Sequence, residues 1–265
     1  MIYQAELTAA LNAARKAASR IMELYVGFTA IPDAQSDITT QADRDSQELI
    51  LQSLQESFPA DAYLAEEATP TIQLCSHGGP RVWVIDPIDG TRGFAQKNGE
   101  FSIMIALVEH GVPVVGVVWE PALSRWTYAT ASGGCFNEAG KSCRVTTTSS
   151  LNRATLIQTH SKPGKPSRQS VALTPAQLVE TYSAGVKLAR VARGEADLYV
   201  NHYPNFNDWD IAAGQVLVTE AGGRVTGMKG QPIVYGKGIG GQTVGLLASN
   251  AQLHDEAVSR LQEVV

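Results

Sequence analysis

The sequence predicts a mixed α/β protein, and three observations lead to that class. In the second half of the chain, apolar runs of strand length alternate with helical patterns, which is typical of α/β architecture. In the first half, two amphipathic helical patterns precede a series of strand-like runs, which is closer to an α+β arrangement. Between them, residues 146–151 are polar and rich in Ser and Thr, as in a linker. We therefore expect an N-terminal α+β domain over residues 1–148 and a C-terminal α/β domain over residues 149–265.

The first half is expected to begin with two helices. Residues 5–26 carry apolar side chains at helical spacing. A second helix should begin after Thr39 or Thr40 and end before Pro59, with Leu49, Ile50 and Leu54 turned inward. Short apolar runs predict the strands that follow, at residues 63–65, 82–85, 101–108, 113–119 and 124–129.

The second half is expected to alternate strands with helices. Strands are predicted at 154–159, 197–200 and 244–248, and helices at about 175–183, 185–193 and 208–221, with Asn250 capping a last helix. Residues 236–241 match the G-x-G-x-x-G spacing of dinucleotide sites. Because a strand rather than a helix is expected after them, we interpret this segment as a surface loop.

Composition excludes several classes of function. The chain has 265 residues, a 44% hydrophobic content sufficient for a core, and a net charge of −5 without any basic block. Nucleic acid and anionic membranes are therefore not expected as partners. Three cysteines without metal-ligand spacing indicate free thiols. With no secretory pattern and no apolar stretch approaching the ~18 residues of a membrane span, we expect a cytoplasmic protein that is a monomer or homodimer.

The most informative segment is residues 82–94, VWVIDPIDGTRGF. Its apolar run ends at Asp86, and a turn through Pro87 would bring Asp86 and Asp89 within about 7 Å between Cα atoms. Two carboxylates held together repel each other unless a cation lies between them, and hard oxygen ligands favour Mg²⁺, Mn²⁺ or Ca²⁺. A calcium EF-hand loop is excluded because Ile88 and Lys97 occupy its third and twelfth positions.

Further acidic residues stand where predicted elements begin or end: Glu66 and Glu67, Asp43, and Asp210. An acidic residue in a first helical turn is explained by the helix dipole alone, whereas Asp210 lies in an apolar stretch where an unpaired carboxylate is costly. If these groups converge, they would hold two or three divalent cations, which can clamp a phosphate. Thr91 could orient a water, and the backbone N–H groups of Gly90 and Thr91 could cradle the phosphate. Since no Cys, His or Ser stands out as a nucleophile, attack by a metal-activated water is expected.

Three motifs together resemble the inositol monophosphatase-like family of lithium-sensitive phosphatases. They are Ala65-Glu66-Glu67, Asp86-Pro87-Ile88-Asp89-Gly90-Thr91 and Trp209-Asp210-x-Ala212-Ala213-Gly214, in the family's order. The resemblance extends over about residues 5–260. It implies a sugar-phosphatase fold, an αβαβα sandwich, and Mg²⁺-dependent hydrolysis of a small phosphorylated metabolite, with two or three Mg²⁺ per site and Mn²⁺ as a substitute.

The resemblance also implies roles for individual residues. The metal ligands would be Glu66, Asp86, the Ile88 carbonyl, Asp89 and Asp210. Thr91 and Glu66 would activate the water, Asp43 would assist that water or a third metal, and Glu67 would lie behind the ligands. The substrate-binding residues would be Gly90, Thr91, His160, Ser161, Lys187 and Asp210.

The substrate is suggested by a finer resemblance. Arg92-Gly93-Phe94, residues 98–101 and 111–118, and Lys187 are most similar to the 3′(2′),5′-bisphosphate nucleotidase branch, which converts 3′-phosphoadenosine 5′-phosphate to AMP. Ala184, Gly185 and Asn201 depart from that branch and remove anion-binding side chains. Inositol phosphate, histidinol phosphate or a sugar bisphosphate therefore stay open as substrates, and a non-catalytic phospho-ligand sensor is a remote alternative.

Overall fold

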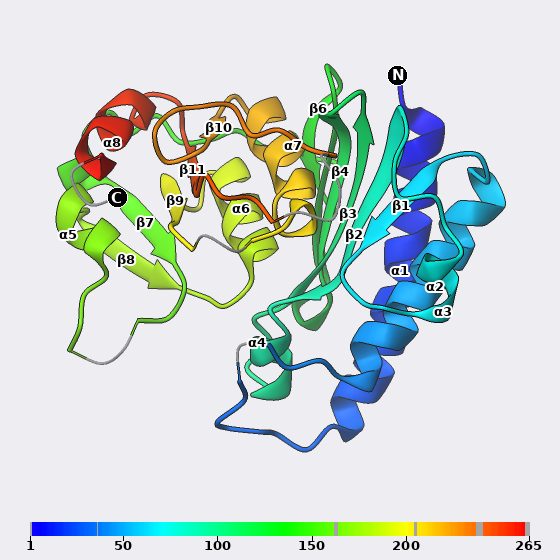
Figure 1. Ribbon diagram of the computed structural model, residues 1–265. Coiled ribbons are helices and arrows are strands. Elements are labelled where there is room, and N and C mark those ends of the chain that lie inside the picture. The colour runs from blue at the N-terminus through cyan, green and yellow to red at the C-terminus, as the bar shows by residue number, and fades with distance from the viewer. Residues whose placement is uncertain (1, 36, 162–163, 204–205, 237–240, 263–265) are drawn as a thin grey trace.

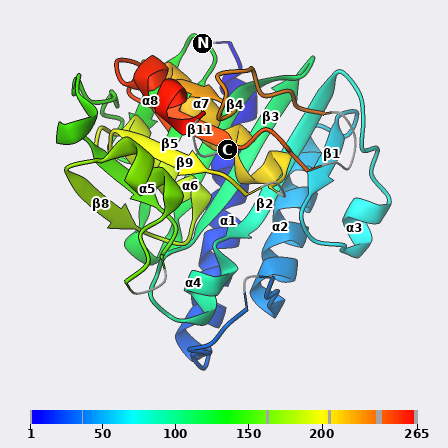
Figure 2. The same ribbon diagram turned by 60° about the vertical axis from the view of Figure 1, so that its left-hand side comes forward.

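Three helical layers alternate with two β-sheets in the computed structural model, which describes residues 2–35, 37–161, 164–203, 206–236 and 241–262 (Figure 1). One outer layer holds α1 (Gln4–Gly27) and α2 (Gln41–Ser57). The central layer holds α6 (Ala184–Ala192) and α7 (Ala212–Glu220), and the far layer holds α5 (Arg168–Leu173) and α8 (His254–Leu261). The αβαβα sandwich expected from the sequence is therefore confirmed, and the turned view in Figure 2 shows α1 and α2 side by side.

The first sheet has six strands in chain order. They are β1 (Ala62–Ala65), β2 (Arg81–Asp89), β3 (Ser102–Glu109), β4 (Val112–Glu120), β5 (Arg125–Thr130) and β6 (Gly134–Asn137). β1 runs parallel to β2, and every later pair is antiparallel. Short helices α3 (Pro70–Gln73), α4 (Thr91–Ala95) and η1 (Pro121–Leu123) lie in its connections.

The second sheet has five strands in the order β10-β11-β9-β7-β8. Their bounds are β7 (Thr155–Gln158), β8 (Gln177–Glu180), β9 (Leu198–Asn201), β10 (Arg224–Thr226) and β11 (Leu246–Ser249). β7 pairs in parallel with β8 and β9, whereas β10 and β11 pair antiparallel. Two short helices, η2 (Leu151–Arg153) and η3 (Asp208–Asp210), complete the elements. Every strand of the first sheet precedes residue 148 and every strand of the second follows it, and the two-domain division itself stays a prediction.

The outer helices form as their sequences indicate. A stripe of small buried residues on α1, including Ala10, Ala14 and Ala17, lets α2 and the sheet pack close to it. α2 begins at Thr40 rather than Thr39, because the Thr40 hydroxyl accepts a hydrogen bond from Ala42 N at 3.1 Å. Ile50 and Leu54 are fully buried as expected, whereas Leu49 is only half-buried.

The central helices pack tightly against each other. A Cβ added at Gly214 of α7 would lie 2.2 Å from Leu188 Cδ1 of α6, so only glycine allows this approach. The core around these helices is continuous with the inner faces of both sheets, through residues such as Val84 and Leu246. α6 and α7 are therefore held in a fixed position between the sheets.

Several predictions of secondary structure were wrong. Asn250 does not cap the last helix, because α8 begins at His254 and its N-cap is Leu253. Residues 175–183 are not a helix: α5 ends earlier, at Leu173, its C-cap Thr174 lies in the left-handed region with φ 46°, and β8 follows. The helix predicted for 208–221 starts as the 3₁₀ turn η3, breaks at Ile211 and resumes as α7. The strand predicted for 82–85 continues to Asp89, and β6 and β10 were not foreseen. Short strands at sheet edges carry too few residues for a clear alternating pattern.

Residues 237–240, most of the expected glycine-rich loop, lie outside the described residues. Within the described ranges, no helix has both the length and the apolar character needed to cross a bilayer.

Candidate active site

A β-bulge in β2 places Asp86 and Asp89 on one face of the sheet. Asp86 pairs with Met104 and Asp89 pairs with Ser102, so three steps along β2 oppose two along β3. In a regular strand, residues three apart point to opposite faces, and the extra residue of a bulge reverses this. The expected turn at Pro87 is therefore wrong, because the chain stays extended to Asp89. It turns at Gly90, with φ 87°, where a Cβ would lie 2.7 Å from Glu100 O.

Asp210 completes an acidic triad with these two residues. Each of Asp86, Asp89 and Asp210 offers a carboxylate oxygen, and the three oxygens lie within 4.8 Å of one another. Asp210 is oriented by its own capping turn, where Asn207 N donates to its Oδ2 at 2.5 Å. The convergence expected for these three carboxylates is therefore present in the structure.

The triad fits a hard metal cation. Asp86 is 1% exposed, and its Oδ1 is buried with no hydrogen-bond partner among the described residues. Burial and then the charge of Glu66 raise the pKa of Asp86 well above its usual value, and burial raises the pKa of Asp210 to about 7. The protein by itself thus disfavours the charged forms, which a divalent cation would stabilise. The acidic triad could therefore hold a metal ion.

The Glu66 carboxyl lies close to Asp210 of the triad, whereas the Glu67 carboxylate is hydrogen-bonded outside the triad. β1 ends next to β2, and Glu66 N donates to Ile85 O at 3.3 Å. Although Glu66 is exposed overall, burial around its carboxyl and the nearby charge of Asp210 raise its pKa. The Glu67 carboxylate instead accepts from Thr39 Oγ1 at 3.0 Å.

A buried glutamine that the sequence did not single out holds the segment of these two glutamates. Gln47 is fully buried; its Nε2 donates to Glu67 O at 2.6 Å and its Oε1 accepts from Glu67 N at 2.8 Å. No motif marks Gln47, which only the packing of α2 against this segment brings into range.

Asp43 and Thr91 meet across the site. Thr91 Oγ1 lies 3.0 Å from Asp43 Oδ1 and 2.9 Å from the Ile88 carbonyl oxygen, so its one proton can go to either acceptor. Asp43 Oδ2 accepts from both N and Oγ1 of Thr40, at 2.8 and 2.6 Å. Burial raises the pKa of the fully buried Asp43 to about 6.

A cleft of about 500 Å³ lies near the triad, since its lining residue Arg92 stands three residues after Asp89 in the chain. Its lining includes Arg92, Thr159, His160, Ser161, Lys165, Tyr182, Asn201, His202 and Tyr203. Arg92 follows Thr91 directly in the chain, and its guanidinium lies over the Tyr182 ring, 5.2 Å from the centroid. Arg92 Nε is buried without a hydrogen-bond partner among the described residues. The cleft is therefore basic and aromatic.

Two expected substrate-binding residues, His160 and Ser161, are on the cleft wall and are tied to carboxylates. His160 Nε2 lies 2.7 Å from Glu100 Oε2, and Ser161 Oγ donates to Glu180 Oε1 at 2.6 Å. The wall thus combines the basic groups with two acidic side chains.

Lys187, a third expected substrate-binding residue, lies beneath the cleft. It is 1% exposed, and its Nζ donates to Thr159 Oγ1 at 3.0 Å and to Tyr182 O at 2.9 Å. Burial lowers the pKa of Lys187 to about 8. In this arrangement Lys187 supports two residues of the cleft wall and is not itself part of the lining.

Sequence reasoning missed Ser183, the N-cap of α6, whose hydroxyl donates to Asp89 Oδ2. The wrongly expected helix at 175–183 placed Ser183 at a helix C-terminus and concealed this role. A serine three residues before Val186, in front of a helical apolar pattern, is the signal that could have revealed it.

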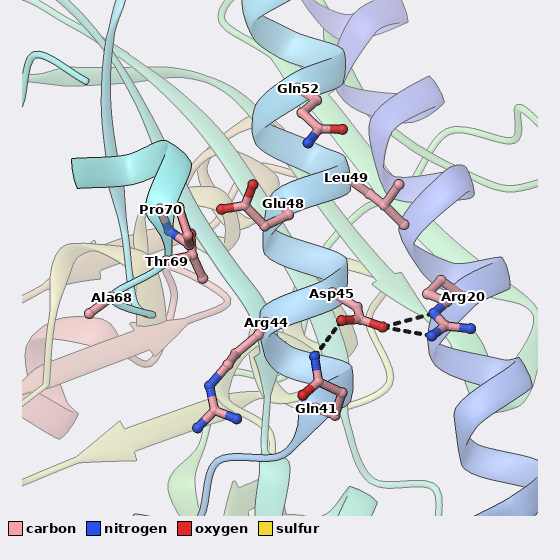
Figure 3. A pocket seen from close by; sticks show the side chains of 10 residues that line it. All are labelled: Arg20, Gln41, Arg44, Asp45, Glu48, Leu49, Gln52, Ala68, Thr69 and Pro70. Carbon is pink, nitrogen blue, oxygen red and sulfur yellow. Dashed lines mark hydrogen bonds and ion pairs between the residues drawn. The ribbon is translucent and has the colours of Figure 1, made fainter. Parts of the chain in front are cut away.

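A second hollow of about 490 Å³ lies on the outer face, between α2 and residues 68–70 (Figure 3). Asp45 bonds there to Arg20 and Gln41, as the dashed lines in Figure 3 mark. None of the site residues predicted from the sequence is in its lining. The cleft beside the acidic triad is therefore the better candidate for the active site.

Comparisons with known proteins agree with this geometry. The profile of the inositol monophosphatase family matches residues 3–265. An inositol monophosphatase from Anabaena superposes with a TM-score of 0.84 at 27% identity, covering 99% of this chain and 97% of that one. An IMPase of Thermotoga maritima superposes with a TM-score of 0.83 at 30% identity, covering 98% of both chains.

The curated relatives are named for different substrates. The chain is 34% identical over 231 residues to a fructose-1,6-bisphosphatase/inositol-1-monophosphatase of Thermotoga maritima, covering 86% of this chain and 84% of that protein. It is 29% identical over 225 residues to the 3′(2′),5′-bisphosphate nucleotidase CysQ of Escherichia coli (84% and 90% covered). It is 34% identical over 239 residues to a histidinol-phosphatase of Mycobacterium tuberculosis (86% and 87% covered). Similar identities to three activities leave the substrate undetermined.

Proposed function

The chain belongs to the inositol monophosphatase family, and from that premise we propose that it is a Mg²⁺-dependent phosphatase that removes the 3′-phosphate of 3′-phosphoadenosine 5′-phosphate to give AMP. The observation that carries the substrate is the basic and aromatic cleft beside the acidic triad. The cytoplasmic location and the monomeric or dimeric state stay predictions.

The acidic residues would hold the metal. Asp86, Asp89 and Asp210, with the Ile88 carbonyl and Glu66, supply the oxygen ligands that Mg²⁺ prefers. When bound, Mg²⁺ neutralises charge on the phosphoryl oxygens and promotes the ionisation of a water. Two or three ions are proposed, with Mn²⁺ as a substitute.

The remaining residues would position the water and the phosphate. Thr91 Oγ1 orients the attacking water, and Asp43 fixes the Thr91 hydroxyl through the 3.0 Å contact. Glu66, whose carboxyl lies close to Asp210, would receive the water's proton. The N–H groups of Gly90 and Thr91, at the start of α4, would bind phosphoryl oxygens.

The cleft supports a substrate with a second anionic group. Arg92, His160, Lys165 and His202 present basic nitrogens there, and a guanidinium such as that of Arg92 is suited to a phosphate oxygen. Tyr203 is 56% exposed, and its ring offers a surface on which a base can stack. A plain inositol phosphate uses neither feature, whereas a nucleoside bisphosphate uses both.

A specific observation favours histidinol phosphate as the second candidate. Glu100 and Glu180 flank the His160 imidazole, with Oε2 atoms at 2.7 Å from Nε2 and 3.7 Å from Nδ1. The same two carboxylates could receive a substrate's ammonium or imidazole group if the His160 side chain turned away.

The test is a substrate panel with Mg²⁺. Phosphate release should be fastest from 3′-phosphoadenosine 5′-phosphate, compared with inositol 1-phosphate, fructose 1,6-bisphosphate and histidinol phosphate. Arg92→Met should raise KM for the nucleotide about tenfold, as expected for the loss of a charge-assisted hydrogen bond, and leave inositol 1-phosphate unaffected. The matched control is Arg44→Met, on the outer hollow. If phosphate release is faster from histidinol phosphate, histidinol phosphate replaces the nucleotide as the proposed substrate. If no compound is turned over, a non-catalytic phospho-ligand sensor is favoured.

A further inference from the structure

The side chain of Asp89 is held from behind by the first turn of α6. Asp89 Oδ2 accepts from Gly185 N at 2.7 Å, from the Ser183 hydroxyl, and from Ser102 Oγ at 3.3 Å. Asp89 is 7% exposed, and Ser102 and Ser183 are fully buried. Gly185 N and the Ser183 hydroxyl already occupy both lone pairs of Oδ2, so Oδ1 is the Asp89 oxygen available to a cation.

The Ser183 hydroxyl group both caps α6 and bonds to the Asp89 carboxylate. Its Oγ accepts from Val186 N at 3.0 Å, which caps α6, and its proton goes to Asp89. Ser102 Oγ lies 2.9 Å from Ser183 Oγ and can donate to it or to Asp89. Gly185 N and the Ser183 hydroxyl therefore both donate to the Asp89 carboxylate, and the Ser102 proton goes either to that carboxylate or to Ser183 Oγ.

Gly185 allows the helix to approach this closely. A Cβ added there would lie 2.5 Å from Ser102 Oγ and 2.8 Å from Met104 Sδ. Any larger residue would push the first turn of α6 away from β3 and lengthen the bond from Gly185 N to Asp89. The departure from the nucleotidase pattern at Gly185 thus has a structural reason.

We propose that Ser183, Ser102 and Gly185 form a positioning cluster that fixes the Asp89 carboxylate for metal binding. The proposal rests on the proposed function only in taking Asp89 as a metal ligand, and not on the substrate. Hydrogen bonds of this kind orient a ligand before the metal arrives, and their loss typically weakens metal affinity by about 10–100-fold.

The experiment measures Mn²⁺ binding to the full chain by titration calorimetry, without substrate. Ser183→Ala should weaken Mn²⁺ binding at least about tenfold, and Ser183→Thr, which keeps the hydroxyl, should restore it. Ser102→Ala, which leaves the helix cap intact, should weaken it less. Ser249→Ala is the matched control, because Ser249 is also a fully buried serine, with Oγ 2.7 Å from His254 Nδ1, outside the cluster.

The outcomes separate positioning from folding. If Ser183→Ala and Ser249→Ala lose similar thermal stability but only the first loses Mn²⁺ affinity, the proposal holds. Parent-like Mn²⁺ binding by Ser183→Ala overturns it; if that variant does not fold, parent-like binding by Ser102→Ala does so instead. A parent protein that binds no Mn²⁺ overturns both this proposal and the metal-dependent function. Turnover of histidinol phosphate in place of the nucleotide would overturn only the proposed substrate.

Discussion

Thr91 Oγ1 lies 3.0 Å from Asp43 Oδ1, although 48 positions separate the two residues in the chain. Asp43 is fixed in turn, because its second oxygen is held by Thr40 at the start of α2. One outer helix therefore orients a hydroxyl at the end of β2, next to the acidic triad. The buried Asp43 carboxylate therefore does more than cap α2, because it also bonds to the Thr91 hydroxyl.

Two variants of Thr91 should distinguish the effect of its hydroxyl group on activity from the effect of its side-chain shape. Thr91→Val keeps the volume but removes the group that Asp43 orients, so kcat should fall about 10²–10⁴-fold, the usual contribution of a positioned proton-transfer group. Thr91→Ser keeps the hydroxyl and should retain most of the activity. Steady-state kinetics on the best substrate checks both variants, and equal loss in the two would show that the methyl group, not the hydroxyl, matters.

Removing one charge from the triad should abolish turnover. Asp89→Asn keeps the size of the side chain but gives up an anionic ligand, so kcat should fall by orders of magnitude and Mn²⁺ affinity should fall with it. Asp45→Asn serves as the control, because the Asp45 carboxylate is outside the site and pairs with Arg20. An Asp89→Asn variant with near-parent turnover would remove Asp89 from the proposed ligands.

Activity should depend on a divalent cation and respond to lithium. Chelation with EDTA should abolish phosphate release, and added Mg²⁺ should restore it. Li⁺ in the range of tens of millimolar should inhibit by competing for one Mg²⁺ position, as mass action requires. The same concentration of K⁺ is the control for ionic strength, and activity unchanged by Li⁺ would count against the lithium sensitivity inferred from the family resemblance.

Stability should fall in acid because of His254. This side chain is fully buried between Ser249 and Thr226, and burial lowers its pKa from 6.5 to about 4. Below pH 6.5 the unfolded chain takes up a proton that the folded chain refuses. The free energy of unfolding should therefore decrease from pH 6.5 to 4, by up to about 3 kcal/mol, and this contribution should level off below pH 4.

Urea unfolding at pH 7 and pH 4.5 checks this prediction. His254→Gln cannot titrate and should show a smaller difference between the two pH values than the parent protein. The control is His77→Gln, the same substitution at a histidine in an exposed position. An unchanged pH dependence in His254→Gln would assign the acid sensitivity to other groups.

The family was predictable from the sequence because its diagnostic motifs are short, local segments. Ala65-Glu66-Glu67, the Asp86–Thr91 segment and Trp209-Asp210 are short motifs, and the resemblance they carry is confirmed over residues 3–265. The first two helices were also predictable, because α1 and α2 are long and strongly periodic. Short elements such as β8 and β10 were not, since three or four residues show no clear period.

The sequence by itself determined the fold class and the phosphatase family, and it predicted which acidic residues are candidate metal ligands, since residue identity and spacing are enough for each. Only the tertiary structure decided how those groups meet. The bulge in β2 turned Asp86 and Asp89 to one face, the packing of α2 brought Asp43 to Thr91, and the close approach of α6 at Gly185 brought Ser183 to Asp89. These are contacts between segments distant in the chain, and they depend on how side chains fill space between layers, which no local pattern records.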